Sequence, residues 1–216
     1  MAKLNLGFAI FNPGSGNGDQ AVSVSASKHT GRVERSISAQ VATDDGSVTK
    51  QVTINQAASV ESVTIDETAS VAKTGGTVTI NGKSNSSKLT FAITAGESPL
   101  TIAVPATYTA AGKTVNNGEA IADDPGATAE YNFSVTFTGI PANTTVGALT
   151  ATLKVTDEAG NEDSTVITQA AGDPTLEIDQ EVINLDVNGT AQTLQVTSNT
   201  NWSISQIVNR MFSMRK

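Results

Sequence analysis

Cysteine is absent from this chain of 216 residues, and aromatic side chains make up only 4% of it. Without cysteine, a secreted scaffold held together by disulfide bonds is excluded. No stretch approaches the ~20 consecutive apolar residues of a membrane-spanning helix, and segment 1–8 lacks the apolar core of a signal peptide. We therefore expect no membrane partner, and a protein that stays or is assembled in the cytoplasm of the cell that makes it.

Histidine occurs once, as His29. With no second histidine and no cysteine, the sequence predicts no transition-metal site and no cofactor. A Ser-His-Asp triad would need His29 beside a serine, and no Gly-x-Ser-x-Gly turn is present to hold that serine. We therefore expect His29 in a surface turn, no catalytic residue and no enzyme activity.

Acidic residues outnumber basic residues by 21 to 13, and most of the excess lies in 59–172. Phosphate binding needs clustered Lys and Arg, so nucleic acid is not expected as a partner. Adjacent acids occur at 44–45, 123–124 and 157–158. Such pairs can serve glycoside hydrolysis or calcium binding, but they stand in turn-forming sequence, which aspartate favours, so we interpret them as turns.

Threonine, valine, serine, alanine, glycine and asparagine dominate what is present, and no helical periodicity is sustained before the C-terminal end. Threonine and valine favour strands, whereas glycine and asparagine favour turns. The sequence therefore predicts an all-β protein whose cores are thin and built mostly from valine and isoleucine.

An internal repeat organises the chain. VTINQAA at 52–58 returns as VITQAA at 166–171, and VTID at 63–66 returns as LEID at 176–179. The two glutamines are 113 residues apart. Each repeat is therefore a module that ends in a Gln-Ala-Ala strand.

Residues 59–172 are predicted to form one complete module. Seven short strands separated by turn clusters indicate an immunoglobulin-like sandwich of two antiparallel sheets. The expected strands are 60–66, 76–82, 88–95, 100–104, 131–138, 149–156 and 163–169. The segment 106–129, rich in Ala, Gly, Asn and Asp, is expected to be an exposed insertion or β-arm.

The two terminal segments each read as part of a module. Residues 1–58 supply later strands, expected at 21–26, 32–41 and 48–57, and residues 173–206 supply earlier strands, expected at 176–178, 182–187, 193–197 and 202–204. A partial sheet leaves backbone groups on its edge without partners. We therefore expect the two segments to complete one split second sandwich.

Closure of the split module is possible in two ways. Within one chain, the covalent link supplies its own effective concentration, which favours this route. Between neighbouring chains, the contact would resemble donor-strand complementation and would run head to tail. Alternatively, 173–206 is a separate truncated module or a flexible arm.

Several motifs resemble those of the BACON module, an immunoglobulin-like sandwich common in proteins of Bacteroidetes and their phages. They are Gly189-Thr190, Asn199-Thr200-Asn201-Trp202, Pro13-Gly14-Ser15-Gly16, 31–35 and 52–58. The resemblance covers both terminal segments well and the middle segment loosely. A small protein made only of such modules is similar to virion proteins of crAss-like phages that infect Bacteroides.

This resemblance implies a structural role as an auxiliary capsid or head-fibre protein. The implied partners are the major capsid protein or other virion proteins, together with neighbouring copies of the chain. The implied location is the surface of the phage capsid, after assembly in the host cytoplasm. The middle module would project outward.

The alternative function is that of a carbohydrate-binding adhesion module, which attaches to glycan or mucus. Tyr108 is the best candidate for an exposed glycan contact. Trp202 could also stack on a sugar, although in this fold such a residue more often packs between the sheets.

The C-terminal tail, 207–216, is basic and amphipathic. Several of its apolar residues share one helical face, and its three cations suit docking onto an acidic shell. The alternative is a short helix that caps the split module. The candidate docking residues are Ile207, Val208, Arg210, Met211, Phe212, Arg215 and Lys216.

Overall fold

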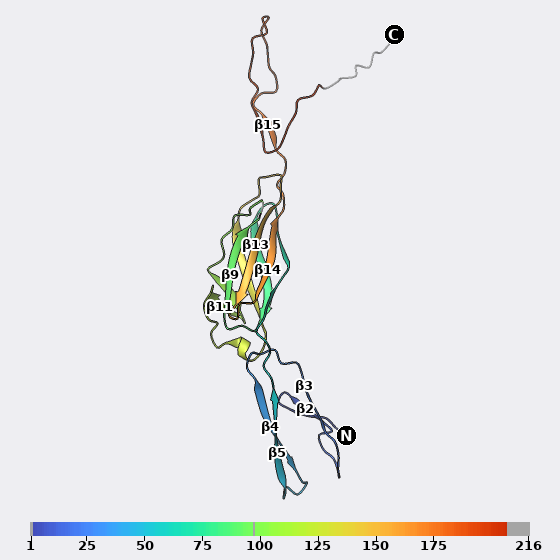
Figure 1. Cartoon of the computed structure of the whole chain (residues 1–216). Helices are drawn as coiled ribbons and strands as arrows, with labels where there is room; N and C mark the ends of the chain where they lie inside the picture. Colours follow the sequence, from blue (N-terminus) through green and yellow to red (C-terminus); the bar gives the residue numbers. More distant parts are fainter. Residues whose placement is uncertain (1, 97, 207–216) are drawn as a thin grey trace, which may run out of the picture.

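The computed structural model describes residues 2–96 and 98–206, in which the regular structure is β-strand apart from one short 3-10 helix. The all-β prediction is therefore confirmed. The molecule is elongated, with a sandwich in the middle and a smaller β piece at either end (Figure 1). We call these parts the N-terminal piece (2–58), the middle sandwich (59–172) and the C-terminal piece (173–206).

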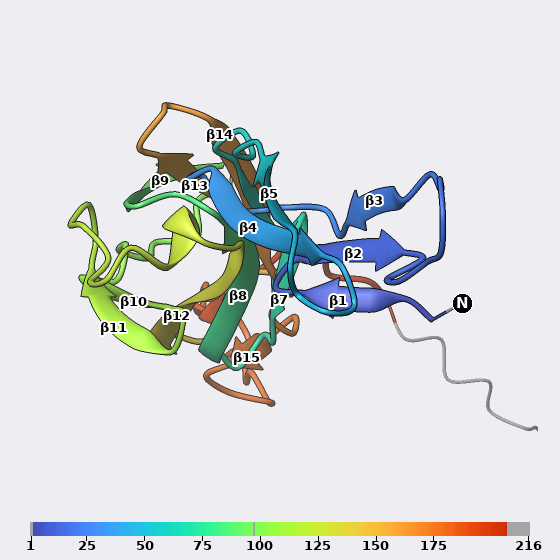
Figure 2. The ribbon, with the colours of Figure 1, turned by 90° about the horizontal axis from the view of Figure 1, so that it is seen from below.

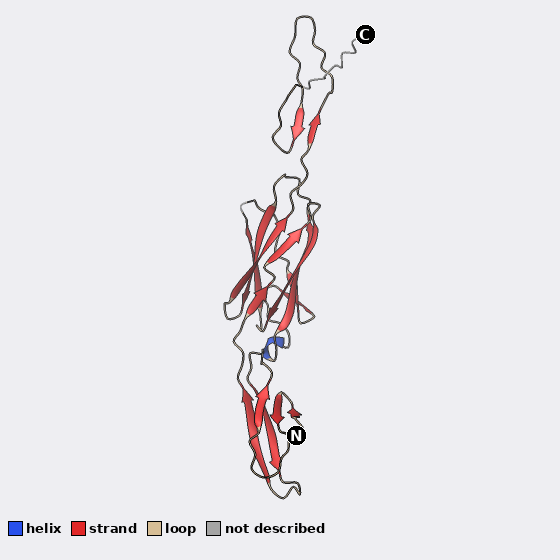
Figure 3. Cartoon of the chain, turned by 90° about the vertical axis from the view of Figure 1, so that its right-hand side faces the viewer, coloured by secondary structure: helices blue, strands red, loops and turns tan. Residues whose placement is uncertain are grey.

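Two sheets face each other in the middle sandwich (Figure 3). Their strand orders are β11-β10-β12-β8-β6 and β7-β14-β13-β9. The strands are β6 (Val63–Ile65), β7 (Thr68–Val71), β8 (Gly76–Ser84), β9 (Leu89–Ala95), β10 (Thr107–Ala110), β11 (Lys113–Asn116), β12 (Tyr131–Ile140), β13 (Leu149–Asp157) and β14 (Glu162–Gln169). Paired strands are antiparallel, except that β7 runs parallel to β14. Six of the seven predicted strands are confirmed, whereas 100–104 forms no strand.

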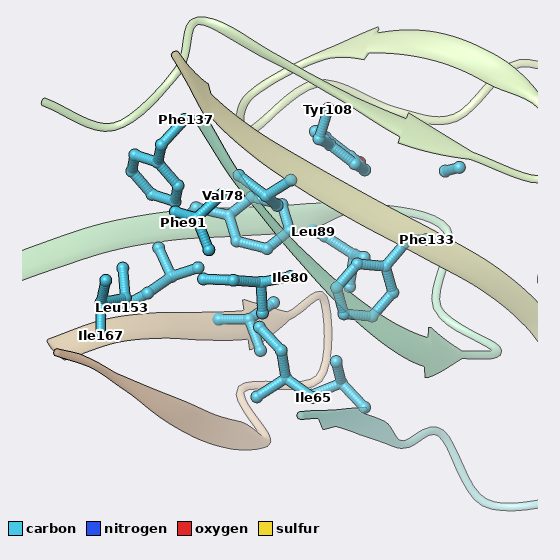
Figure 4. Packing of buried hydrophobic residues seen from close by; sticks show 14 of the residues in the cluster. Ile65, Val78, Ile80, Leu89, Phe91, Tyr108, Phe133, Phe137, Leu153 and Ile167 are labelled. Atoms are coloured by element: carbon cyan, nitrogen blue, oxygen red, sulfur yellow. The ribbon is translucent and has the colours of Figure 1, made fainter. Parts of the chain in front are cut away.

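The hydrophobic core lies between these two sheets. Strand β12 buries every second side chain from Tyr131 to Phe137, as expected for a strand with one inward face. Phe91 contacts Tyr108 and Phe133 edge-on, with ring centroids 4.9 and 5.7 Å apart. Figure 4 shows these rings beside aliphatic side chains from both sheets. The principal buried cluster consists of residues between Val63 and Ile167, so it belongs to the middle sandwich alone.

The segment 106–129, expected to be an exposed insertion or β-arm, contains a β-hairpin, but this hairpin packs onto the sandwich and is not an exposed arm. Strands β10 and β11 form a hairpin, and β10 pairs with β12 through Thr109 and Ala110. The rest of the segment includes the 3-10 helix η1 (Pro125–Ala127). The segment extends a sheet and buries apolar side chains, because an alternating Thr-Tyr-Thr-Ala strand finds an edge to join. The buried ones are Tyr108, Ala110, Val115 and Ile121.

The N-terminal piece contains a three-stranded sheet and a separate hairpin. The sheet consists of β1 (Leu4–Leu6), β2 (Ala9–Asn12) and β3 (Ser23–Ala26), and the hairpin of β4 (Arg35–Ala42) and β5 (Thr49–Gln56). Figure 2 shows the sheet to one side of the hairpin. In and beside this hairpin, Ala39 is buried, whereas Val33, Val41, Val48 and Val52 are exposed.

The C-terminal piece is the least regular part. It forms one pair of short strands, β15 (Leu176–Ile178) and β16 (Val196–Ser198). The predicted strands at 182–187 and 202–204 are absent from this described segment.

The split module does not close within one chain in this structure. The N-terminal and C-terminal pieces lie at opposite ends of the middle sandwich (Figures 1 and 3). The expected closure within a chain is therefore not met. The reason is topological: the chain passes from the N-terminal piece into β6 and β7, and β14 runs in the same direction as β7, so the chain leaves the sandwich at its far end.

The assigned core makes a prediction about two neighbouring residues of β14. Ile167 is fully buried, whereas Val166 is exposed. We expect Ile167→Ala to lower the free energy of unfolding by about 2–5 kcal/mol, because it leaves a cavity. Val166→Ala should cost less than about 1 kcal/mol, reflecting strand propensity alone. Urea unfolding followed by circular dichroism measures both, and equal losses would contradict the assigned facing of β14.

Candidate functional site

The predicted glycan contact, Tyr108, is not at the surface. It is 3% exposed and packs against Phe91 in the core. Burial raises the pKa of its hydroxyl to about 12. Since a sugar can stack only on an accessible ring, the expectation that Tyr108 is an exposed contact is wrong.

The acidic pairs lie in turns. Thr43 and Ser47 donate to the Asp45 carboxylate, which lowers its pKa to about 2 because these donors favour the charged form. Asp157, the last residue of β13, accepts hydrogen bonds from the backbone and side chain of Asn161 across the turn between β13 and β14. Within residues 2–96 and 98–206, no group of three or more His, Cys, Asp or Glu is arranged to hold a metal ion.

His29 is buried rather than exposed, contrary to expectation. Its Nε2 atom donates to the Val33 carbonyl oxygen at 2.7 Å. Asn143 occupies the equivalent place one repeat later and is also buried, and its side-chain nitrogen donates to the Gly147 carbonyl at 2.8 Å. Both side chains therefore brace a loop from inside.

These two loops belong to the junctions that join the middle sandwich to the terminal pieces. At the N-terminal junction, the buried side chain of Asn85 satisfies three backbone groups. Its oxygen accepts from the Ser62 N–H at 2.8 Å, and its nitrogen donates to the carbonyls of Thr30 and Val60, each at 3.0 Å. Asn85 thus connects Thr30 of the N-terminal piece to the first residues of the middle sandwich, Val60 and Ser62.

The same hydrogen-bond set recurs at the C-terminal junction. Asn199 accepts from the Thr175 N–H at 2.9 Å and donates to the carbonyls of Thr144 and Asp173, at 2.8 and 2.9 Å. Each partner lies 113 or 114 residues after its counterpart around Asn85. The two junctions are therefore one structural unit used twice.

A further pair of backbone bonds supports this match. Ser59 donates its N–H to the Gly31 carbonyl at 2.8 Å, and Gly172 donates to the Thr145 carbonyl at 2.7 Å. Gly31 approaches the backbone of Thr128 so closely that a Cβ atom would clash there. The junction therefore fixes how consecutive modules stack.

Each junction also carries an ion pair. Arg32 binds the carboxylate of Asp124, and its guanidinium also donates to the backbone carbonyl of Asn85. At the other junction, Lys73 binds Asp173 at 2.6 Å with both side chains exposed. The partly buried Arg32 pair holds the N-terminal piece more firmly than an exposed pair would, because solvent screens exposed charges.

Sequence reasoning missed these junctions, although their signal is present. Asn-Ser at 85–86 and Asn-Thr at 199–200 match across the repeat, as do Ser84 and Ser198 before them. Read singly, each is a polar turn residue, and only its burial or its three partners show that it organises a junction.

The terminal pieces expose most of the large apolar side chains. Fifteen of the eighteen exposed large hydrophobic residues in the described part of the chain lie on these pieces. Trp202, expected between two sheets, is 51% exposed in the single chain. It lines an open groove of about 460 Å³ together with Pro174 and Leu176. Both ends of the molecule therefore present apolar surface.

The predicted docking tail lies outside the described residues. This applies to Ile207, Val208, Arg210, Met211, Phe212, Arg215 and Lys216. In the described part, no helix is long and apolar enough to cross a membrane.

No protein-family model matches the chain, and no curated protein matches its sequence.

Burial of both tyrosines predicts a delayed titration. Burial raises the pKa of Tyr108 to about 12 and also raises that of Tyr131 above its ordinary value. Since the unfolded pKa is about 10, the stability that these groups contribute is complete below pH ~10 and is lost as the pH rises toward 12. We expect phenolate absorbance to appear together with unfolding, whereas the urea-unfolded chain titrates near 10. A phenolate signal from the folded protein at pH ~10 would contradict their burial.

The hydrogen bonds of Asn85 at the N-terminal junction make a prediction about the stability of the protein. Asn85→Ala removes one acceptor and two donors and leaves three backbone groups without partners. We expect the free energy of unfolding to fall by about 1–3 kcal/mol, with faster amide exchange at Thr30 and Ser62. Asn201→Ala, an exposed change in the matching segment of the repeat, is the control and should alter neither. Similar effects of the two changes would show that Asn85 is not the centre of the junction.

Proposed function

We propose that the protein is a non-enzymatic structural protein of a phage virion that decorates or stabilises the capsid as an auxiliary capsid or head-fibre protein. The observation that carries this proposal is the elongated array of β modules joined by two matching junctions. Such junctions set a fixed spacing between modules, which suits a spacer, brick or fibre. The resemblance of the terminal pieces to BACON-like modules supports the virion setting.

Charge supports docking by the C-terminal tail. The middle sandwich is acidic, with 12 acidic and 5 basic residues in 59–172, whereas the tail carries three cations and no acid. A basic end on an acidic rod orients the molecule on an acidic shell, because opposite charges steer the approach. The middle sandwich then projects from the shell.

The second candidate function is carbohydrate binding, and it rests on the groove at Trp202. A half-exposed indole beside a groove is a surface on which a sugar ring can stack. This assigns the glycan contact to the C-terminal piece rather than to Tyr108. It predicts that Trp202→Ala abolishes binding to a glycan array.

Docking of the tail is tested on isolated capsids of the phage that encodes the chain. We expect the protein to cosediment with capsids in many copies and to be released by salt, since salt screens exposed charges. Replacing Arg210, Arg215 and Lys216 by Gln should reduce binding at least tenfold. Replacing Lys83, Lys113 and Lys154, which are exposed on the middle sandwich, by Gln makes the same change in charge away from both ends and should leave binding unchanged.

Two results would contradict the proposal. If quantitative mass spectrometry does not detect the chain in purified virions, the structural role is contradicted. Glycan binding that depends on Trp202, without capsid binding, would favour the adhesion module instead.

A further inference from the structure

We propose that the C-terminal piece of one chain and the N-terminal piece of the next form a composite sandwich, so that chains join head to tail into a continuous array of modules. The partner is thus a second copy of this chain. This inference deepens the proposed structural function and rests on it, because it states how the structural unit assembles.

The apolar side chains of β15 are the first evidence. In the repeat, Leu176 and Ile178 stand where Val63 and Ile65 stand in the middle sandwich. Leu176 and Ile178 are 62% and 49% exposed, whereas Val63 and Ile65 are each 7% exposed. The C-terminal piece therefore presents core side chains without the sheet that covers them in a complete module.

Trp202 and Ile204, at the end of the C-terminal piece, are likewise exposed although their counterparts are core residues. Aligned on their apolar alternation, they correspond to Leu89 and Phe91 at the start of strand β9, which is an offset of 113 and so one residue less than the 114 that separates Asn85 from Asn199. Both counterparts are buried in the middle sandwich, where β9 pairs with β13. In the C-terminal piece, the equivalent segment forms no strand and its apolar side chains are exposed.

The N-terminal piece offers the missing part. Its β4–β5 hairpin corresponds to the β13–β14 hairpin, with Ile54 in the position of Ile167. In the middle sandwich, β7 covers one edge of that hairpin and β9 covers the other. Among the described residues, β4 and β5 form a sheet of only two strands, so both edges remain open. The C-terminal piece contains the counterparts of β7 and β9.

The turn that follows β7 sets the expected register. The Gly75 N–H bonds to the Ala72 carbonyl, and the Gly189 N–H bonds to the Asp186 carbonyl, so this part is offset by 114 residues. Residues 182–185 then correspond to β7, which places Ile183 and Leu185 at the inward positions of Ala69 and Val71. Because Thr168 faces Ser70 across the parallel pair, Asn55 of one chain should face Asn184 of the next.

The geometry of the chain selects a neighbour rather than itself as the partner. The two pieces lie at opposite ends of the middle sandwich (Figure 1). Because the two junctions use the same set of hydrogen bonds, each junction joins one module to the next in the same way. Charge agrees with this pairing, since residues 2–58 carry a net charge of +1 and residues 173–206 carry −5. A composite module would continue the existing stacking without a new kind of interface.

Disulfide trapping tests the register directly, because the chain contains no cysteine. Asn55→Cys and Asn184→Cys are made in separate full-length chains, mixed and oxidised. We expect a disulfide-linked dimer of twice the chain mass of 22.1 kDa. Asn188→Cys, an exposed asparagine in the turn after 182–185, is the matched partner for Asn55→Cys and should give no dimer.

The chain that carries both Asn55→Cys and Asn184→Cys distinguishes closure between chains from closure within one. We expect a ladder of linked oligomers whose length grows with protein concentration. An internally crosslinked monomer would overturn the inference, and so would the absence of any crosslink together with a monomeric mass at all concentrations in light scattering.

A pair of charge substitutions tests association without crosslinking. Ile178→Asp places a carboxylate where the composite core would form, and we expect at least a tenfold weaker self-association with unchanged unfolding of the middle sandwich. Val187→Asp is the control: Val187 is fully exposed, and its counterpart Lys73 is exposed in the complete module, so association should persist. Equal effects of the two changes would overturn the proposed core contact.

These outcomes separate the assembly from the proposed function. Monomeric chains that still cosediment with capsids would refute the composite module and leave the structural role standing. Chains that join head to tail but are absent from virions would do the reverse.

Discussion

The parallel pairing of β7 with β14 decides how the rest of the molecule is laid out. Strand β7 leads away from the N-terminal piece, and β14 follows the same direction about a hundred residues later, with Val166 opposite Thr68. The chain therefore leaves the sandwich at the end opposite the one at which it entered. A molecule built this way is a rod, and its two incomplete pieces are held apart by the sandwich between them.

The junctions turn that rod into a defined array. An asparagine side chain offers one acceptor and two donors, and Asn85 uses them on three backbone groups that come from different segments. Asn199 does the same at the far end. Because an unpaired buried polar group is costly, this arrangement tolerates little change at Asn85 and fixes the angle between modules better than apolar contact alone would.

Sheet edges and apolar faces explain why the ends are the candidate functional surfaces. Exposed edges and apolar patches invite pairing with another chain. The middle sandwich shows what satisfied versions of the same positions look like: Val63 and Ile65 are buried, and both edges of the β13–β14 hairpin are occupied. The proposed head-to-tail assembly and the proposed structural role both follow from this comparison within one chain.

The sequence by itself determined six strands of the middle sandwich and the repeat, because alternation and turn residues act over a few neighbouring positions and were readable at β8, β12, β13 and β14. It did not predict β7, and it predicted a strand at 100–104 that the structure lacks. It did not reveal that 106–129 extends a sheet, that His29 and Tyr108 are buried, or that Trp202 is exposed. Those outcomes depend on which edge a strand joins and on what lies across the core, and residues far apart in the chain decide both. The opposite placement of the two ends was likewise decided by tertiary structure, since one parallel strand pair sets the direction in which the chain leaves the sandwich.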